Sequence, residues 1–317
     1  MFQRAKQEKL SFLVPLDGSR LAASVLPTVE RLATRLHARV TLLHIIEQHA
    51  PTTIHGERHL TGVAQAQIYL EEIAIQLRSS GIPVETHVHE EKEDNVARSI
   101  VEHTRESKID LVIMCTHGRG GLRDLLFGSI AQQALRQGTQ SILLVLPGED
   151  GKAPTLDLRR ILVPLDGTAA HEPALPAAMT LARAFGAELH LVLVIPTLAT
   201  LSGSQAAAGL LLPATMRAVL DLAQQGASDY LEQAVVQCRD QGVLAQAEVL
   251  RGDAVPIVLH FARRLNIDLL VTASHGRAGL EALLAGSVAP RVTGRVNCPL
   301  LLIRAEESNV ESNDRRN

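Results

Sequence analysis

The sequence contains few aromatic residues, and none of them is tryptophan. Aromatic residues make up 2% of the 317 residues, whereas proteins that hold single-stranded nucleic acid stack its bases on aromatic side chains. The chain also lacks an excess of positive charge, because 31 Lys and Arg are outweighed by 34 Asp and Glu, for a net charge of −3. We therefore expect no nucleic-acid partner.

Cysteine is also scarce. Cys115, Cys238 and Cys298 are odd in number and contain no Cys-x-x-Cys pair, which fits a reducing compartment better than a disulfide framework. The N-terminal segment carries charges and only a short apolar run before Asp17, unlike a signal peptide. These features predict a cytoplasmic location.

Long uninterrupted hydrophobic runs are missing as well. The longest stretch without a charged residue, Leu189 to Met216, is broken by two prolines and two glycines. A membrane-spanning helix needs about 20 consecutive, mainly apolar residues, so we expect no membrane segment. With 46% hydrophobic and 21% charged residues, the composition is that of a globular protein. The length suits two domains of about 150 residues each.

Two phrases occur twice in the chain. FLVPLDG at 12–18 returns as ILVPLDG at 161–167, and CTHGRGGLRDLLFGS at 115–129 returns as ASHGRAGLEALLAGS at 273–287. Repeats of this length are whole domains, and the residues between the copies are rich in Pro, Gly and charge, as in a linker. We predict domain 1 over residues 1–148, a linker over 149–158, domain 2 over 159–305 and a disordered tail over 306–317.

Short apolar runs alternate with helical periods in each copy. After the first expected strand, residues 20–37 are predicted to form one helix whose apolar face includes Leu26, Val29 and Leu32. Five strands that alternate with helices predict a parallel sheet core covered by helices on both faces.

The last expected strand of each copy lacks a next strand within its own half. These strands are SILLVL at 141–146 and PLLLIR at 299–304. Because an exposed apolar edge templates aggregation, we expect the two strands to pair with each other about a pseudo-twofold axis. The chain would then be an internal pseudo-dimer, either complete by itself or part of a homodimer.

Ligands of open parallel sheets bind at the carboxyl ends of strands, where the strand order reverses. Two segments of the first copy directly follow expected strands: Pro15-Leu16-Asp17-Gly18 and the segment from Cys115 to Ser129. In the latter, glycines let the backbone approach a phosphate, an arginine adds charge, and a serine begins an expected helix. The candidates are Gly118, Arg119, Gly128 and Ser129, and in the second copy Gly276, Arg277, Gly286 and Ser287.

A simpler interpretation is that these glycines only close turns and these serines only cap helices. Asp17 likewise either makes an Asx-turn before Gly18 or contacts a ligand. His117 and His275 invite a catalytic interpretation, but the sequence places no carboxylate or nucleophile beside them. We expect each to pack or hydrogen-bond within its loop, and we predict no catalytic residue.

Histidines are concentrated in the first half, and HGERH at 55–59 spaces two of them four residues apart. That spacing suits a metal on a helix, but the segment is typical of a loop and lacks the His-Glu-x-x-His order. We therefore expect a solvated polar loop and no metal site. Cys115, a free cysteine at a strand end, is expected to be buried and inert rather than a redox sensor.

The set VPLDGS, HGRGGL…LLFGS and SILLVLP resembles the universal stress protein family, and the match spans both halves. Nucleotide-binding members of that family carry Gly-x-x-Gly, nine residues, then Gly-Ser or Gly-Thr. Here Cys115 and Ala273 stand in place of the leading glycine. The resemblance implies two tandem flavodoxin-like α/β domains, with adenine at Asp17 and the backbone near Ile45. In the second copy Asp166 and Val194 take these positions.

The resemblance implies ATP as the ligand, with or without Mg²⁺, and a role as a stress-response sensor or signalling protein. Two alternatives stay open: an interaction protein of the same fold with degenerate sites, and slow phosphate hydrolysis. The complete predicted nucleotide-contacting set is Pro15, Asp17, Ile45, Cys115, His117, Gly118, Arg119, Gly128, Ser129, Pro164, Asp166, Val194, Ala273, His275, Gly276, Arg277, Gly286 and Ser287.

Residues Pro196 to Ala227 have no counterpart in the first copy and are rich in Ala, Gly and Leu. They follow the end of an expected strand near the second candidate site. We expect this insertion to form a lid or a partner surface that makes the two sites unequal, with an inert surface loop as the alternative.

Overall fold

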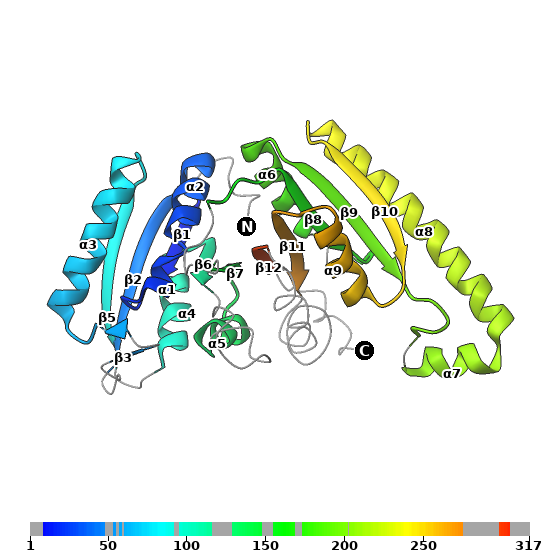
Figure 1. Cartoon of the computed structure of the whole chain (residues 1–317), viewed down its shortest axis with the longest axis horizontal. Coiled ribbons are helices and arrows are strands. Elements are labelled where there is room, and N and C mark those ends of the chain that lie inside the picture. The colour runs from blue at the N-terminus through cyan, green and yellow to red at the C-terminus, as the bar shows by residue number, and fades with distance from the viewer. Residues whose placement is uncertain are drawn as a thin grey trace, which may run out of the picture.

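One mixed sheet runs through the molecule (Figure 1). A computed structural model describes residues 9–47, 53–54, 57–58, 60–91, 95–115, 129–147, 155–168, 173–201, 203–274 and 298–304. The first half contributes the strands β1 (Ser11–Pro15), β2 (Arg39–Glu47), β5 (Val84–Glu91), β6 (Leu111–Cys115) and β7 (Ser141–Val145). The second contributes β8 (Arg160–Leu165), β9 (Glu188–Ile195), β10 (Ala245–Arg251), β11 (Leu269–Ser274) and β12 (Leu300–Arg304). A separate small hairpin pairs β3 (Thr53–Ile54) with β4 (Glu57–Arg58).

The two halves arrange their strands alike. The order is β10-β9-β8-β11-β12-β7-β6-β1-β2-β5, so each half reads third, second, first, fourth, fifth in chain order. All pairs within a half are parallel. The predicted α/β class, with two tandem domains each built on five parallel strands, is confirmed. The strand order reverses between β1 and β6 in one half and between β8 and β11 in the other.

The halves join through β7 and β12, which run antiparallel at the centre of the sheet (Figure 1). Leu144 faces Leu300, and Leu143 faces Leu301, all four buried. The backbone N–H of Arg304 also donates to Oγ of Ser141 across the joint, at 3.2 Å. The prediction that the last strands pair with each other is therefore confirmed.

Helices cover both faces, as predicted. In the first half these are α1 (Arg20–Ala23), α2 (Leu26–Leu36), α3 (Val63–Ser79), α4 (Val96–Glu106) and α5 (Ser129–Gln137); in the second, α6 (Ala174–Phe185), α7 (Gly203–Leu211), α8 (Pro213–Asp240) and α9 (Ala254–Arg264). One buried cluster contains residues of α2, α3, α6 and α8, and the other contains residues of α4, α5 and α9. Each cluster continues across the joint, so the halves share one two-sided core. None of the described helices is long and apolar enough to cross a membrane.

The prediction of a single helix over residues 20–37 was wrong. The structure has two helices there, α1 and α2. Pro27 lies in the first turn of α2, and proline has no N–H with which to continue the hydrogen bonds of α1. Ser24, the C-cap of α1, donates its hydroxyl to the carbonyl of Leu21 at 2.6 Å. Because the helix is broken here, Ser24 lies at the end of α1, where its hydroxyl contacts Cys115 at the end of β6.

The insertion of the second half consists of helices. It forms α7 and the first part of α8, a helix of 28 residues whose counterpart α3 has 17. Leu210 and Leu211 at the end of α7 are 85% and 80% exposed. Its role as a lid or partner surface stays a prediction.

Candidate functional site

The candidate site of the first half lies where the strand order reverses, at the carboxyl ends of β1 and β6. Asp17 follows β1, and Cys115 ends β6. β1 and β6 are parallel neighbours, so the two residues lie at the same edge of the sheet. Within the described residues, helix α5 starts at Ser129. The predicted residues His117, Gly118, Arg119 and Gly128 lie outside the described residues.

Asp17 forms the Asx-turn that the sequence allowed. Its Oδ1 accepts from the backbone N–H of Ser19 at 2.9 Å and from the Ser19 hydroxyl at 2.6 Å. Ser19 in turn caps α1, because its Oγ accepts from the N–H of Ala22 at 3.1 Å. The turn interpretation is thus correct. Both hydrogen bonds from Ser19 use Oδ1, so a ligand contact through Oδ2 of Asp17 is compatible with the turn.

The second half builds the same turn. Oδ1 of Asp166 accepts from the backbone N–H of Thr168 at 2.9 Å and from its hydroxyl at 2.7 Å. Pro164 lies in β8, Val194 in β9 and Ala273 in β11. The other predicted residues of this half, His275, Gly276, Arg277, Gly286 and Ser287, lie outside the described residues.

The glycine after each aspartate adopts a left-handed backbone, with φ of +90° at Gly18 and +75° at Gly167. Their surroundings differ. A Cβ atom at Gly18 would lie 2.7 Å from Cγ of Leu60, whereas one at Gly167 would have Cδ1 of Leu193 as its nearest neighbour, at 4.0 Å. Leu60 therefore covers the turn of the first half closely.

His44 holds Leu60 in that position. This buried side chain lies in β2, and its Nδ1 is 2.7 Å from the carbonyl oxygen of Leu16 while its Nε2 is 3.0 Å from that of Leu60. The strand registers place Leu193 at the corresponding point of the second half. Sequence reasoning missed Leu60 and His44 as site residues; the usable signal was a histidine inside the apolar run of β2.

Cys115 occupies the position of the missing leading glycine. Burial raises the pKa of its thiol from 9.0 to about 11; the hydrogen bond with Ser24 lowers the pKa, and the Asp17 charge raises it. The Oγ atom of Ser24 lies 3.3 Å from the Sγ atom of Cys115. The thiol is therefore protonated at neutral pH, which agrees with the inert rather than the redox interpretation.

Ile45 and Val194 occupy corresponding positions of β2 and β9. Ile45 is buried and Val194 partly buried, and both side chains pack in the cluster that contains α4 and α9. Both lie near the carboxyl end of their strand, with Ile45 opposite His89 and Val194 opposite Leu250. The structure thus places the strand backbones that the resemblance assigns to adenine, one in each half.

The family model described as the Universal stress protein family matches residues 11–145 and again 157–304. A universal stress protein of Mycolicibacterium smegmatis is 25% identical over 92% of this chain and 96% of its own length. One from Methanocaldococcus jannaschii is 27% identical over 46% of this chain and 82% of its own length.

A solved structure shares the whole architecture. The universal stress protein from Archaeoglobus fulgidus superposes with a TM-score of 0.67 at 16% identity, covering 93% of this chain and 98% of its own. That likeness concerns the fold alone. Because the family model matches both halves of the repeat, this chain belongs to the universal stress protein family, as a member with two tandem domains.

Proposed function

We propose that this chain binds an adenine nucleotide, ATP, in at least one half and acts as a stress-response sensor or signalling protein. The observation that carries the proposal is the strand-order reversal between the parallel neighbours β1 and β6. Asp17 follows β1 and Cys115 ends β6, so both lie at the same edge of the sheet. The next described helix, α5, starts at Ser129, the serine that ends the predicted phosphate-binding segment. A crevice at such a reversal is where open α/β sheets bind ligands, and a helix N-terminus attracts phosphate.

In this proposal each part of the β1–β6 reversal has a separate task. The strand backbone near Ile45 and the carboxylate of Asp17 receive the adenine, while the N–H groups at the start of α5 receive the phosphates. The Asx-turn holds Asp17 in place through Ser19, so the carboxylate is oriented before a ligand arrives. Cys115, protonated and partly buried, contributes shape rather than charge.

We do not assign turnover to this site. The sequence places neither a general base nor a pair of carboxylates for Mg²⁺ beside the phosphate-binding segment. A sensor needs only that the bound and free states differ in shape or in partner affinity. Hydrolysis remains testable by measuring phosphate release with added Mg²⁺, for which we expect no release above background.

A cytoplasmic location is part of the proposal. Cys115, Cys238 and Cys298 are odd in number and contain no Cys-x-x-Cys pair. That cysteine usage fits a reducing compartment better than a disulfide framework.

Mass spectrometry of the gently purified, full-length protein tests the proposal. We expect an adenine nucleotide to be released from the protein on denaturation, in up to two equivalents per chain. A protein that carries none and also fails to bind added ATP in a titration would contradict the proposal.

A further inference from the structure

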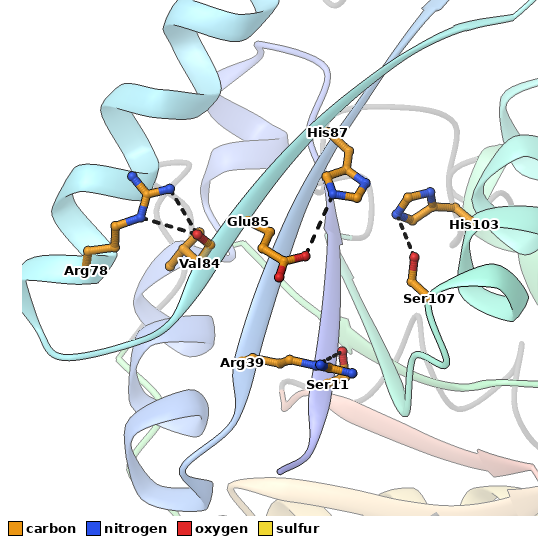
Figure 2. Close-up of polar contacts among 8 residues, drawn as sticks. All are labelled: Ser11, Arg39, Arg78, Val84, Glu85, His87, His103 and Ser107. Atoms are coloured by element: carbon orange, nitrogen blue, oxygen red, sulfur yellow. Dashed lines mark hydrogen bonds and ion pairs between the residues drawn. The ribbon is translucent and has the colours of Figure 1, made fainter. Parts of the chain in front are cut away.

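Three histidines gather at the outer edge of the first half, away from the β1–β6 reversal. His87 and His89 are two residues apart in β5, so both project from the same face of that strand. His103 lies on α4, and Figure 2 shows it turned toward His87. One ligand atom from each of the three residues can be chosen so that all lie within 4.8 Å of one another.

The rings meet edge to face. The ring centroid of His103 lies 4.9 Å from that of His87 and 5.0 Å from that of His89, with interplanar angles of 87° and 86°. His103 thus contacts both of the other rings.

His103 carries a buried atom that needs a partner. The side chain is 3% exposed, and its Nδ1 makes no hydrogen bond with any described residue. Its Nε2 lies 3.4 Å from the Ser107 hydroxyl (Figure 2). In the tautomer in which Nε2–H donates to Ser107, Nδ1 carries a free lone pair. Buried polar atoms are rarely left without a partner in native proteins, and a metal ion would supply one.

Glu85, on the same face of β5, has its Oε2 3.8 Å from Nε2 of His87 (Figure 2). A carboxylate in that place orients a metal-binding histidine.

The second half shows what the fold puts at this position when the histidines are absent. The strand registers match His87 with Glu248 and His89 with Leu250. Helices α4 and α9 both have 11 residues, which matches His103 with Phe261. None of the three positions keeps a histidine, so the shared architecture does not require one.

That second-half position is filled by direct contacts. The guanidinium carbon of Arg264 lies 4.9 Å from the ring centroid of Phe261, and its Nη2 lies 3.3 Å from Oε2 of Glu248. Polar and aromatic groups there satisfy one another without a ligand. The first half, by contrast, leaves the buried Nδ1 of His103 without a hydrogen-bond partner among the described residues.

We propose that His87, His89 and His103 form a binding site for a divalent transition-metal ion of the zinc type. Three imidazoles suit Zn²⁺ and its neighbours rather than Mg²⁺ or Ca²⁺, which prefer oxygen. A tetrahedral ion with metal–nitrogen distances of about 2.05 Å holds its ligands about 3.3 Å apart, so small ring rotations close the site. Three protein ligands leave a fourth position for water or an exogenous ligand.

An ion can reach this site from solvent. β5 ends the sheet, so no further strand covers its outer edge. His87 and His89 are both partly exposed, while His103 lies deeper. The two strand residues would capture the ion and the helix residue would complete its coordination.

The test is a titration of the full-length, chelator-treated protein with Zn²⁺, followed by calorimetry. We expect one tight equivalent per chain. His103→Phe and His89→Leu each introduce the residue of the second half and should weaken that binding at least about 100-fold. His260→Gln, which changes an exposed histidine of α9, should leave it unchanged.

Two further readouts separate a metal site from mere packing. Bound Co²⁺ should give the visible absorption of a tetrahedral site in the wild type and lose it in both variants. Zn²⁺ should raise the Tm of the wild type but not that of His103→Phe. Without metal, the Tm of His103→Phe should be no lower than that of the wild type, because the substitution removes a buried Nδ1 that has no hydrogen-bond partner among the described residues. If His103→Phe does not fold, His89→Leu on the edge strand decides.

The proposal is overturned if the wild type binds no saturable equivalent of Zn²⁺, or if a folded His103→Phe or His89→Leu binds it as tightly as the wild type. Equal loss of binding in His260→Gln would overturn it as well. None of these outcomes depends on whether the β1–β6 crevice binds nucleotide.

Discussion

The first and second halves hold the turn after their first strand with the same hydrogen bonds, yet they differ in what surrounds it. Asp17 and Asp166 both accept from the backbone and hydroxyl of the residue two positions later. Around the first turn lie His44 and Leu60. Around the second, Leu193 stands where His44 would be.

The same contrast recurs at the edges of the sheet. The first half carries three facing histidines where the second carries an ion pair and an aromatic ring. The second half instead carries the helical insertion with exposed leucines. The duplicated parts are the strands and the Asx-turns after the first strand of each half, whereas the three facing histidines belong to the first half. The two halves are therefore internal controls for each other.

The largest effect should follow from separating the halves. Residues Met1–Leu146 expressed alone would leave β7 with Ile142, Leu143 and Leu144 at an uncovered edge. Such an edge pairs with another copy, so this fragment should dimerise or aggregate while the full chain does not. Light scattering that finds the fragment monomeric and stable would rule out the role we assign to the joint.

The two turns should respond unequally to the same substitution. Gly18→Ala and Gly167→Ala each place a side chain at positive φ, which costs about 1–2 kcal/mol. Gly18→Ala should cost roughly 1 kcal/mol more, because its Cβ meets Leu60. Urea unfolding of both variants measures the difference, and equal losses of unfolding free energy would show that Leu60 does not restrain the first turn.

Acid should weaken the first half through His103. Its pKa is lowered from 6.5 to about 4 in the folded state, so the unfolded chain binds the proton more readily. The stability associated with neutral His103 is present above pH 6.5 and is lost as the pH falls toward 4. In metal-free protein, His103→Phe should flatten this part of the stability curve; an unchanged slope between pH 6.5 and 4 would contradict the assignment.

Cys115→Ala, which introduces the residue of the second half, should have the smallest effect. At neutral pH the thiol is protonated, and we expect unfolding free energy to change by no more than about 1 kcal/mol. Because the folded pKa is raised from 9.0 to about 11, stability should fall as pH rises through that window, and less steeply in the variant. A variant with the wild-type slope would show that Cys115 does not titrate in this way.

Much of the fold could be predicted because it depends on local patterns. Alternating apolar runs and helical periods specified the parallel sheets, and the unpaired apolar strand at the end of each copy specified the joint. The break before α2 depended on Pro27 within an otherwise helical pattern. That signal was visible in the sequence, but the apolar periodicity on both sides concealed it.

The histidine cluster could not be predicted from spacing alone. His87 and His89 alternate as strand neighbours do, but His103 meets them only because α4 packs over that face of the sheet. The prediction of no metal site was based on HGERH at 55–59, where two histidines are close in sequence. Closeness of His87 and His103 arises from tertiary packing, for which one sequence carries no direct signal.

The proposed binding of adenine nucleotide, in at least one half, can be tested by calorimetric titration of the full-length protein with ATP. Wild type is compared with Gly128→Val, Gly286→Val and the double variant. We expect a valine side chain to block phosphate approach, so each change removes any binding in its own half and the double variant binds no ATP. Tight ATP binding that persists unchanged in all three variants would contradict it.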